Sequence, residues 1–469
     1  MLNFLSKFPK IGKKRIYLDY ASITPVDPRV LKHVSKISQK YSANPSSLYK
    51  EGVEAFKELE RSRATVAKHL EAHADEIVFT SGGTESNNLA IQGVLKAFLK
   101  NSAQKTKSDF KPHIISSVIE HPAVRELLLQ YQEENVCDVT FIPVDERGIV
   151  DLKELKKALR LETILVTIMY VNNEIGTIQH IAEVSKIVRH FKKERQEQAK
   201  QNSLELGGSL TTLLSSQSSH SNYTQYPLVH TDACQAVLFC SLRIPALGVD
   251  MMTLDSAKFY GPRSVGALYI KRSVIASKAI TAIQIGGSQE QDLRAGTENV
   301  SGISGFAYAM DLAVAEKEKE SVRLGKMRDF LVSELKKFSE QNKMIVDGSG
   351  KIPKIIFNGT YENDSYGNPM RVPNNLNICV PGMDAEYAVL RLDVRGICVS
   401  SVTSCRSKNE DSTSYVVEAL GNASASHENS ESTFARDCGK SSLRITLGRF
   451  TTIGDSRRLL RALVEVIGK

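Results

Sequence analysis

Two short apolar runs between Tyr226 and Ile270 constrain the fold more than any other stretch of this sequence. One run leads into His230-Thr231-Asp232, and the other leads into Asp255-Ser256-Ala257-Lys258. A short apolar run that ends in polar residues is typical of a buried strand in an α/β sheet, and ligands bind at the carboxyl edge of such sheets. We therefore expect the carboxylate of Asp232 and the amine of Lys258 to face one crevice.

A carboxylate and a lysine in one crevice point to a specific cofactor. A buried aspartate can pair with a protonated pyridine nitrogen, and a desolvated lysine can form a Schiff base with an aldehyde. Together, Asp232 and Lys258 predict a site for pyridoxal 5'-phosphate. For a lone lysine the commoner interpretation is a surface side chain, with the aspartate as a helix cap. The spacing within an α/β pattern and the motifs that follow favour the cofactor.

A second motif follows the strand-like run Ile77-Val78-Phe79. The segment from Thr80 to Asn88 reads TSGGTESNN, and a helical pattern continues to Leu99. Glycines let backbone N–H groups approach an anion, and the N-terminus of a helix favours negative charge. A Gly-Gly-Thr sequence alone is more often a turn. Its place between a strand and a helix favours a cradle for the cofactor phosphate.

These motifs resemble those of the pyridoxal-phosphate-dependent cysteine desulfurases, the NifS/IscS-like members of the class V aminotransferase family. The resemblance extends along nearly the whole chain in the segments IYLDYASITPVDPRV from Ile16, TSGGTESNN from Thr80, HTDACQA from His230, KFYGP from Lys258 and SLRITLGRFTT from Ser442. It implies the fold type I of pyridoxal-phosphate-dependent transferases. In this α/β fold, a large domain has a mixed, mostly parallel sheet flanked by helices, and a smaller α+β domain follows at the C-terminus.

The resemblance implies three parts of the chain. We expect an N-terminal arm over residues 1–26 that packs with the small domain, a large cofactor-binding domain over 27–316, and a small domain over 317–469 that carries a catalytic cysteine loop. Residues 192–225 are rich in Ser, Gln, Glu and Lys where the family has a short link. They predict an inserted mobile surface loop.

The resemblance also assigns catalytic roles. Lys258 would bind the cofactor and move the α-proton of the substrate, and His121 would stack on the pyridoxal ring and shuttle protons. Arg444 would grip the substrate carboxylate as a fork, although a structural ion pair is the alternative for an arginine between buried neighbours. Cys405, which follows a strand and opens a polar loop, would be the nucleophile that receives sulfur.

Further residues would hold the cofactor. Asp232 would keep the ring nitrogen protonated, while Asn173 and Gln235 would lie near the phenolic oxygen. The residues expected to contact the phosphate are Gly83, Thr84, Ser256 and, from the other subunit of a homodimer, Thr297. Ala257 stands where the family has a histidine that contacts the phosphate. Ser256 would donate to the phosphate instead, and Asp255 would be unfavourable beside the phosphate dianion unless it turns away.

Composition excludes several other classes of protein. The formal charge of +8 comes from 61 basic and 53 acidic residues that are spread along the chain, so no dense basic face for nucleic acid is expected. Seven cysteines without CxxC or zinc spacing indicate a reducing, cytoplasmic location and argue against a disulfide scaffold and a metal site. No apolar run is long enough to span a membrane. The basic start, Met1 to Arg15, is interpreted as an arm, with a short organelle presequence as the alternative.

The implied reaction converts L-cysteine to L-alanine and leaves sulfur on Cys405 as a persulfide, for delivery to an acceptor protein such as an iron–sulfur scaffold or to tRNA thiolation. Two alternatives remain within the fold. Another class V enzyme, such as an aminotransferase or a selenocysteine lyase, would keep Lys258 and Asp232 but would not need a cysteine in a loop. A scaffold that has lost catalysis would be expected to lose Lys258 or Arg444.

Overall fold

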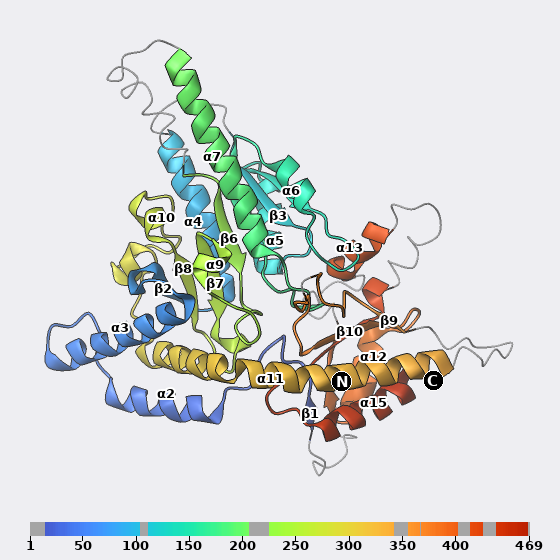
Figure 1. The fold of residues 1–469 in the computed structure, drawn as a ribbon. Coiled ribbons are helices and arrows are strands. Elements are labelled where there is room, and N and C mark those ends of the chain that lie inside the picture. Colours follow the sequence, from blue (N-terminus) through green and yellow to red (C-terminus); the bar gives the residue numbers. More distant parts are fainter. Residues whose placement is uncertain are drawn as a thin grey trace.

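The computed structural model describes residues 15–103, 111–205, 225–341, 355–365, 367–401, 413–424 and 438–467. A seven-stranded sheet forms the centre of the large domain, and a four-stranded sheet lies in the small domain (Figure 1). The prediction of a mixed, mostly parallel sheet with flanking helices and a smaller α+β domain is confirmed.

The large sheet has the strand order β2-β8-β7-β6-β5-β3-β4. Only β8 runs antiparallel to its neighbours β2 and β7, and the other pairs are parallel. The strands are β2 (Ile77–Thr80), β3 (His113–Ser117), β4 (Asp138–Ile142), β5 (Thr163–Thr167), β6 (Leu228–Asp232), β7 (Met251–Asp255) and β8 (Gly266–Ile270). The carboxyl ends of β6 and β7 are neighbours, so the two polar motifs that follow the apolar runs meet at one edge of the sheet.

Helices cover both faces of this sheet. Successive side chains of a strand point to opposite faces, so each strand packs against helices on both sides. On one face, Leu228 and Met251 pack with α4 (Gly83–Ala103) and α5 (Pro122–Glu133). On the other, Val229 and Met252 pack in a second core. That core includes side chains from α2 (Pro28–Lys40), α3 (Lys50–Leu70), α6 (Leu152–Ala158), α7 (Ile181–Glu205), α9 (Ile244–Leu247) and α11 (Val300–Gln341). Buried strands with apolar residues on both faces explain why the runs in the sequence are continuous rather than alternating.

The small domain is built on an antiparallel sheet in the order β12-β13-β10-β9. Its elements are β9 (Ile356–Phe357), β10 (Asn375–Cys379), α12 (Ala385–Val394), β12 (Ser400–Ser401), α13 (Tyr415–Ser424), β13 (Ser442–Thr446) and α15 (Ile453–Ile467). Near the N-terminus, β1 (Ile16–Tyr17) pairs with β11 (Ile397–Cys398), and Ile16 packs in the core of this domain. Helix α11 runs from the large domain to the small one (Figure 1), and the proposed boundary between residues 316 and 317 falls inside it.

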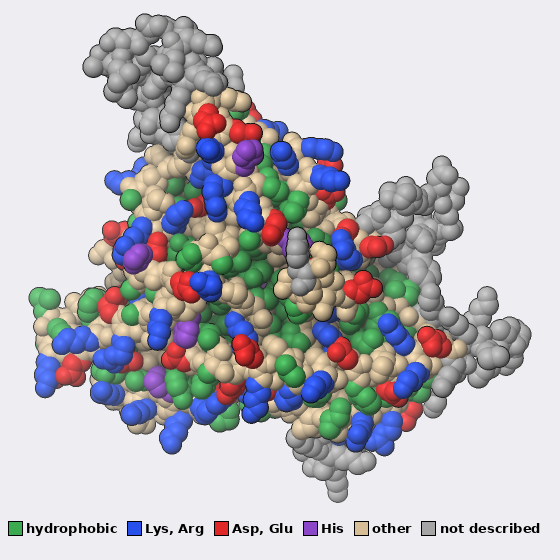
Figure 2. Space-filling view, viewed as in Figure 1, with side chains coloured by type: hydrophobic (Ala, Val, Ile, Leu, Met, Phe, Trp, Pro, Cys, Tyr) green, Lys and Arg blue, Asp and Glu red, His purple; other side chains and the backbone are tan. Residues whose placement is uncertain are grey.

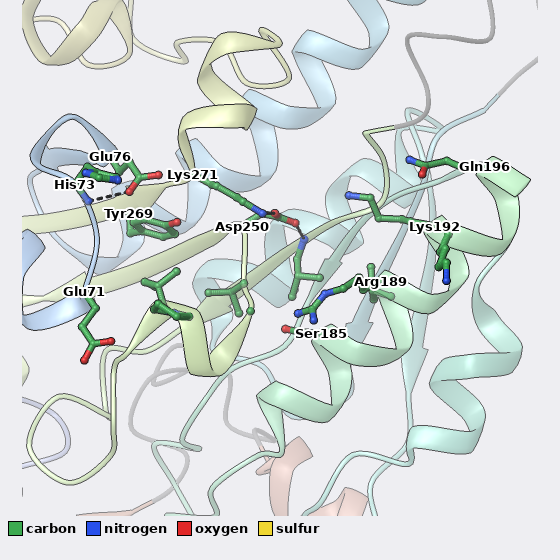
Figure 3. Close-up of a pocket in the computed structure, with 17 residues that line it drawn as sticks. Glu71, His73, Glu76, Ser185, Arg189, Lys192, Gln196, Asp250, Tyr269 and Lys271 are labelled. Carbon is green, nitrogen blue, oxygen red and sulfur yellow. Dashed lines mark hydrogen bonds and ion pairs between the residues drawn. The ribbon is translucent and has the colours of Figure 1, made fainter.

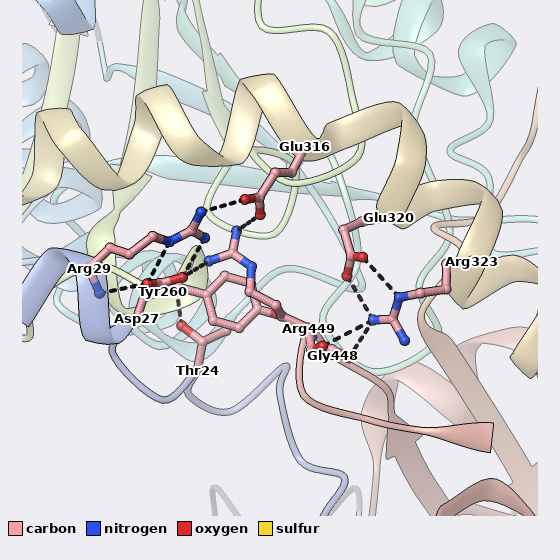
Figure 4. Close-up of polar contacts among 9 residues, drawn as sticks. All are labelled: Thr24, Asp27, Arg29, Tyr260, Glu316, Glu320, Arg323, Gly448 and Arg449. Atoms are coloured by element: carbon pink, nitrogen blue, oxygen red, sulfur yellow. Dashed lines mark hydrogen bonds and ion pairs between the residues drawn. The ribbon is translucent and has the colours of Figure 1, made fainter. Parts of the chain in front are cut away.

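An ion-pair network that is buried at Asp27 and reaches the surface at Arg29 joins the start of α2, α11 and the C-terminal part of the chain (Figure 4). Arg29 and Arg449 both pair with Asp27 and with Glu316 on α11. Burial alone would raise the pKa of Asp27, but hydrogen bonds from Arg29 and the charge of Arg449 lower it to about 2. The guanidinium of Arg449 also lies 4.2 Å from the ring centre of Tyr260, which follows the predicted cofactor lysine. The two domains are therefore linked close to that lysine.

Helix α7 corrects one expectation. It continues to Glu205, so the prediction that residues 192–225 form a loop is wrong for the first part of that segment; residues 206–224 lie outside the described structure. The sequence there lacks an apolar face and was therefore assigned to a loop. Two pairs spaced by one helical turn, His190–Glu194 and Lys193–Glu197, supply local support for a polar helix instead.

One pair of cysteines forms a disulfide that the sequence did not predict. Cys379 on β10 and Cys438 just before β13 form a disulfide with a Cα–Cα distance of 5.4 Å. The sequence analysis expected no disulfide, because neither residue belongs to a cysteine spacing motif. The pairing of β10 with β13 brings these residues together across 59 positions of sequence, which spacing alone does not reveal.

Two further expectations concern the surface. Figure 2 shows Lys and Arg interspersed with Asp and Glu over the visible face, as the spread of charge along the sequence predicts. Among the described residues, no helix is both long enough and apolar enough to cross a bilayer.

Candidate active site

A cavity of about 300 Å³ opens at the carboxyl ends of β6 and β7. Ala21 and Ser22 of the N-terminal segment, residues from five strand ends and loops of the large domain, and β13 of the small domain all contribute to its walls. The lining includes these predicted site residues: Gly83, Thr84, His121, Asn173, Asp232, Gln235, Lys258 and Arg444. Ser256 and Thr297 are not part of it, and Cys405 lies outside the described residues.

Asp232, the last residue of β6, is held in a fixed orientation. One carboxylate oxygen accepts a hydrogen bond from the Asn87 side-chain amide at 2.6 Å, and the other accepts one from the backbone N–H of Cys234 at 3.0 Å. The residue is only 7% exposed, so these two donors replace water around its charge. Asn87 was not predicted. Its position one helical turn after Gly83 on α4 is the signal that could have identified it.

Lys258 ends a short 3₁₀ turn, Ser256–Lys258, that follows β7. Asp255 caps this turn by accepting from the backbone N–H of Ala257 at 2.9 Å. The Nζ atom of Lys258 donates to the backbone carbonyls of Ser22 at 2.6 Å and Ala21 at 3.3 Å. The N-terminal segment therefore positions the lysine amine at the wall of the cavity.

His121 caps the N-terminus of α5 through Nδ1, which accepts from the backbone N–H of Ala123 at 3.1 Å. Burial lowers the pKa of His121, so the ring is neutral near pH 7 and its proton lies on Nε2. The neighbouring Glu120 is fully buried, and burial raises its pKa to about 8. Its carboxyl group accepts from the backbone N–H of Met169 at 3.0 Å. At neutral pH, neither His121 nor Glu120 therefore adds much charge near Asp232.

Arg444, on β13, is almost completely buried at the edge of the cavity. Its guanidinium pairs with Asp19 at 2.9 Å and donates to the Ser22 hydroxyl at 2.5 Å and to the Asn173 carbonyl at 3.1 Å. The Nε atom has no partner in the described structure. Arg444 thus has the ion pair that was the alternative interpretation, and it also faces the cavity, where a substrate carboxylate could compete with Asp19.

The glycine loop has the shape of an anion cradle. Gly82 has φ 152°, which disfavours any residue with a side chain, and a Cβ atom at Gly83 would lie 2.7 Å from the sulfur of Cys234. The same hypothetical Cβ lies 3.3 Å from a carboxylate oxygen of Asp255. Asp255 therefore faces the cradle, so the condition under which it would be harmless to a phosphate, that it turns away, is not met in this structure. The Ser256 hydroxyl instead lies against Gly261 and has no partner among the described residues.

These residues fit the ring of pyridoxal phosphate, but one residue at the phosphate cradle is unfavourable for the phosphate. Four groups converge on one cavity. The amine of Lys258 matches the aldehyde of the cofactor, and the carboxylate of Asp232, held by two donors, matches its pyridine nitrogen. The neutral imidazole of His121 matches the ring face, and the amide of Gln235 matches the phenolic oxygen. The glycines at the start of α4 and the N-terminus of that helix suit a phosphate. The carboxylate of Asp255 opposes a phosphate dianion there.

The comparisons with known proteins agree with this geometry. The family model described as aminotransferase class-V matches residues 16–194 and 220–428. A protein named cysteine desulfurase IscS from Dictyoglomus turgidum is 36% identical over 457 residues, which cover 97% of this chain and 95% of that protein. Human selenocysteine lyase is 30% identical over 466 residues, covering 97% and 93% of the two chains. A solved structure titled NifS-like protein superposes with a TM-score of 0.73 at 29% identity, covering 97% of this chain and 99% of the other.

Proposed function

Since the chain belongs to the class-V aminotransferase family, we propose that it is a cysteine desulfurase that converts L-cysteine to L-alanine and receives the sulfur as an enzyme persulfide. The observation that carries the proposal is the convergence of Lys258, Asp232 and Arg444 on one cavity in a chain similar to desulfurases over almost its full length. A catalytically inactive scaffold would not need to preserve all three groups.

Each cavity residue has a proposed part in the reaction. Pyridoxal phosphate, when bound, supplies an electron sink for the negative charge that develops as the substrate loses its α-proton. Lys258 accepts that proton through Nζ, and Asp232 holds a proton on the ring nitrogen by its negative charge. Arg444 binds the substrate carboxylate, and His121, whose imidazole lines the cavity, would stack on the ring and shuttle protons.

Cys405 is the proposed nucleophile. Its thiolate attacks the sulfur of the substrate, the bond between that sulfur and Cβ breaks, and Cβ takes up a proton to give alanine. The described cysteines are poor candidates. Burial raises the pKa of Cys137 to about 11, that of Cys240 to about 12, and that of Cys234 well above its usual range. Cys379 and Cys438 are joined to each other.

Cys398 is a poor candidate because of its position, since it lies on β11 and does not line the cavity. A persulfide-forming thiol must be free and reduced, so a reducing, cytoplasmic location is part of the proposal. An iron–sulfur scaffold or a tRNA-thiolation protein would be the sulfur acceptor.

A homodimer is also proposed. Thr297 is exposed in the single chain and does not reach the cavity of its own subunit, which agrees with a role across an interface. Large apolar side chains remain exposed at Leu48 (97%) and Ile285 (92%), and an interface between two copies would cover such groups. Size-exclusion chromatography with light scattering tests this part, and a monomer at micromolar concentration would contradict it.

The function is tested by incubating the protein with L-cysteine and measuring alanine together with protein-bound persulfide. We expect both products in equal amounts in the first turnover. A parallel assay with L-selenocysteine separates the desulfurase from a selenocysteine lyase. Rapid turnover of selenocysteine with no alanine from cysteine would replace the present proposal with the lyase.

We predict that Asp255→Ser tightens the binding of pyridoxal phosphate by at least about ten-fold, or about 1.4 kcal/mol, because a carboxylate near the phosphate dianion is removed. Serine can still cap the turn at Ala257, so the position of Lys258 should be kept. The measurement is the dissociation constant of the cofactor from an absorbance titration. Asp255→Asn, which keeps the shape and removes the charge, is the matched variant. Unchanged or weaker binding by both variants would show that Asp255 does not oppose the phosphate.

We also predict that Arg444→Lys raises the KM for L-cysteine by about ten-fold or more, because an ammonium cannot reproduce the two-pronged contact of a guanidinium with a carboxylate. The value of kcat should change less. Arg395→Lys is the control and should leave KM unchanged, because Arg395 caps the C-terminus of α12, pairs with Glu465 and does not line the cavity. If Arg444→Lys lowers the melting temperature while the KM stays normal, the pair with Asp19 is purely structural.

A further inference from the structure

A second, larger cavity lies at the opposite edge of the central sheet (Figure 3). Its volume is about 710 Å³, and it is bounded by α7, by the start of β6 at Val229, by the turn Gly248–Asp250 before β7 and by Lys271 after β8. Lys258 and Asp232 lie at the other ends of these same strands. The two cavities are therefore separated by the length of the sheet.

The acidic residues of this cavity are already engaged with the protein. Glu71 pairs with Arg243 at 2.5 Å. Glu76 accepts hydrogen bonds from the backbone N–H groups of His73 at 2.9 Å and Arg272 at 2.8 Å. Asp250 accepts from the backbone N–H of Val229 at 3.0 Å and lies 3.4 Å from the amine of Lys271. These carboxylates hold the turns of the wall in place through these contacts.

Two cations on α7 have no such partner. Arg189 and Lys192 line the cavity, and neither forms an ion pair with a described residue. Figure 3 shows both side chains extending from the helix toward the strand ends, where Asp250 and Lys271 lie. Burial lowers the pKa of Lys192, the charge of Asp250 raises it, and the charges of Lys271 and Arg189 lower it, so three cations and the Asp250 carboxylate are clustered here.

Two more features of this cavity indicate a formed ligand-binding site. The hydroxyl of Ser185, one turn before Arg189 on α7, is on a residue only 2% exposed and has no hydrogen-bond partner in the described structure. A buried hydroxyl without a partner costs free energy that a bound ligand would recover. Gly248 has φ 70°, and a Cβ there would lie 2.5 Å from Nη2 of Arg189. The glycine leaves the space through which the guanidinium reaches the cavity.

We propose that this cavity binds a small phosphate-bearing molecule, with its anionic group held by Arg189, Lys192 and Lys271 and by the hydroxyl of Ser185. A planar guanidinium and two amines are the groups that proteins use for multivalent oxyanions. Val188, Ile244 and Pro245 provide an apolar wall for the remainder of such a ligand. The site lies away from the proposed active site, so it would act as a separate binding site on the enzyme.

The test is a calorimetric titration with inorganic pyrophosphate at constant ionic strength, using protein saturated with pyridoxal phosphate so that the first cradle is filled. We expect saturable binding by the wild type and at least ten-fold weaker binding by the double variant R189Q/K192Q. S185A should weaken binding by a smaller factor. K186Q is the matched control, because Lys186 is exposed on the same helix and does not line the cavity.

Two outcomes would overturn the proposal. One is the absence of saturable pyrophosphate binding by the wild type, and the other is equal affinity in the wild type and in R189Q/K192Q. Melting temperatures of all variants verify that each is folded. Cofactor absorbance recorded during the titration shows whether pyrophosphate displaces pyridoxal phosphate. A protein that holds no cofactor would refute the proposed function, yet the difference between R189Q/K192Q and K186Q would still report on this cavity.

Discussion

Lys258→Ala is expected to abolish turnover of L-cysteine, with kcat/KM reduced by at least about 10⁴-fold, because both the covalent anchor of the cofactor and the general base are removed. The amine already sits at the cavity wall, held by the carbonyls of Ala21 and Ser22. Alanine formation is the measurement. Lys186→Ala, on an exposed face of α7, is the control and should keep wild-type activity.

A readout independent of activity accompanies this prediction. Borohydride reduction of the wild-type protein with pyridoxal phosphate should attach the cofactor irreversibly to the peptide that contains Lys258, which mass spectrometry identifies. The Lys258→Ala protein should carry no such label. Labelling at another lysine, or wild-type turnover by the variant, would remove Lys258 from the proposed mechanism.

Cys405→Ser should bind pyridoxal phosphate normally and still show the absorbance change that follows addition of L-cysteine. It should release no alanine and carry no persulfide, because a hydroxyl is a far weaker nucleophile toward sulfur than a thiolate. Cys398→Ser is the matched control, since Cys398 lies on β11 and does not line the active-site cavity.

The contrary result has a definite meaning. If Cys405→Ser turns over cysteine at the wild-type rate and releases sulfide with pyruvate and ammonia, sulfide leaves directly by elimination and the protein is a lyase. If Cys398→Ser is the variant that loses persulfide, the sulfur-accepting thiol lies on β11 instead. Persulfide mapping by mass spectrometry distinguishes these two cases.

The carboxyl ends of the strands could be predicted from sequence, because a buried parallel strand leaves a continuous apolar run that ends where polarity returns. That pattern identified Asp232 and Lys258, and the structure places both at one cavity. The turn after β7 could not be resolved in the same way. Asp255 and Ser256 are adjacent, so a change of one residue in the register of the turn decides which of them faces the cradle.

Contacts between distant segments could not be predicted from the sequence either. The pair between Asp19 and Arg444 joins residues 425 positions apart, and no local pattern encodes it. The glycines and the threonine of its motif predict a phosphate cradle but say nothing of Asn87. Only the helical face that Asn87 shares with Gly83 indicates that its side chain points to the site. The polar end of α7 was assigned to a loop, since its stability depends on pairs between side chains and not on a buried stripe.

The N-terminal segment has a consequence for how the protein matures on the ribosome. Its residues are synthesised long before their partners, because Ile16 pairs with Ile397, the Leu18 carbonyl accepts from the backbone N–H of Thr446, and Asp19 pairs with Arg444. The large-domain core can form while the rest of the chain is still being translated, because domains fold as units from the N-terminal side. This segment must wait until β13 has been made. The catalytic cavity is thus completed only after the sequence through β13 has left the exit tunnel.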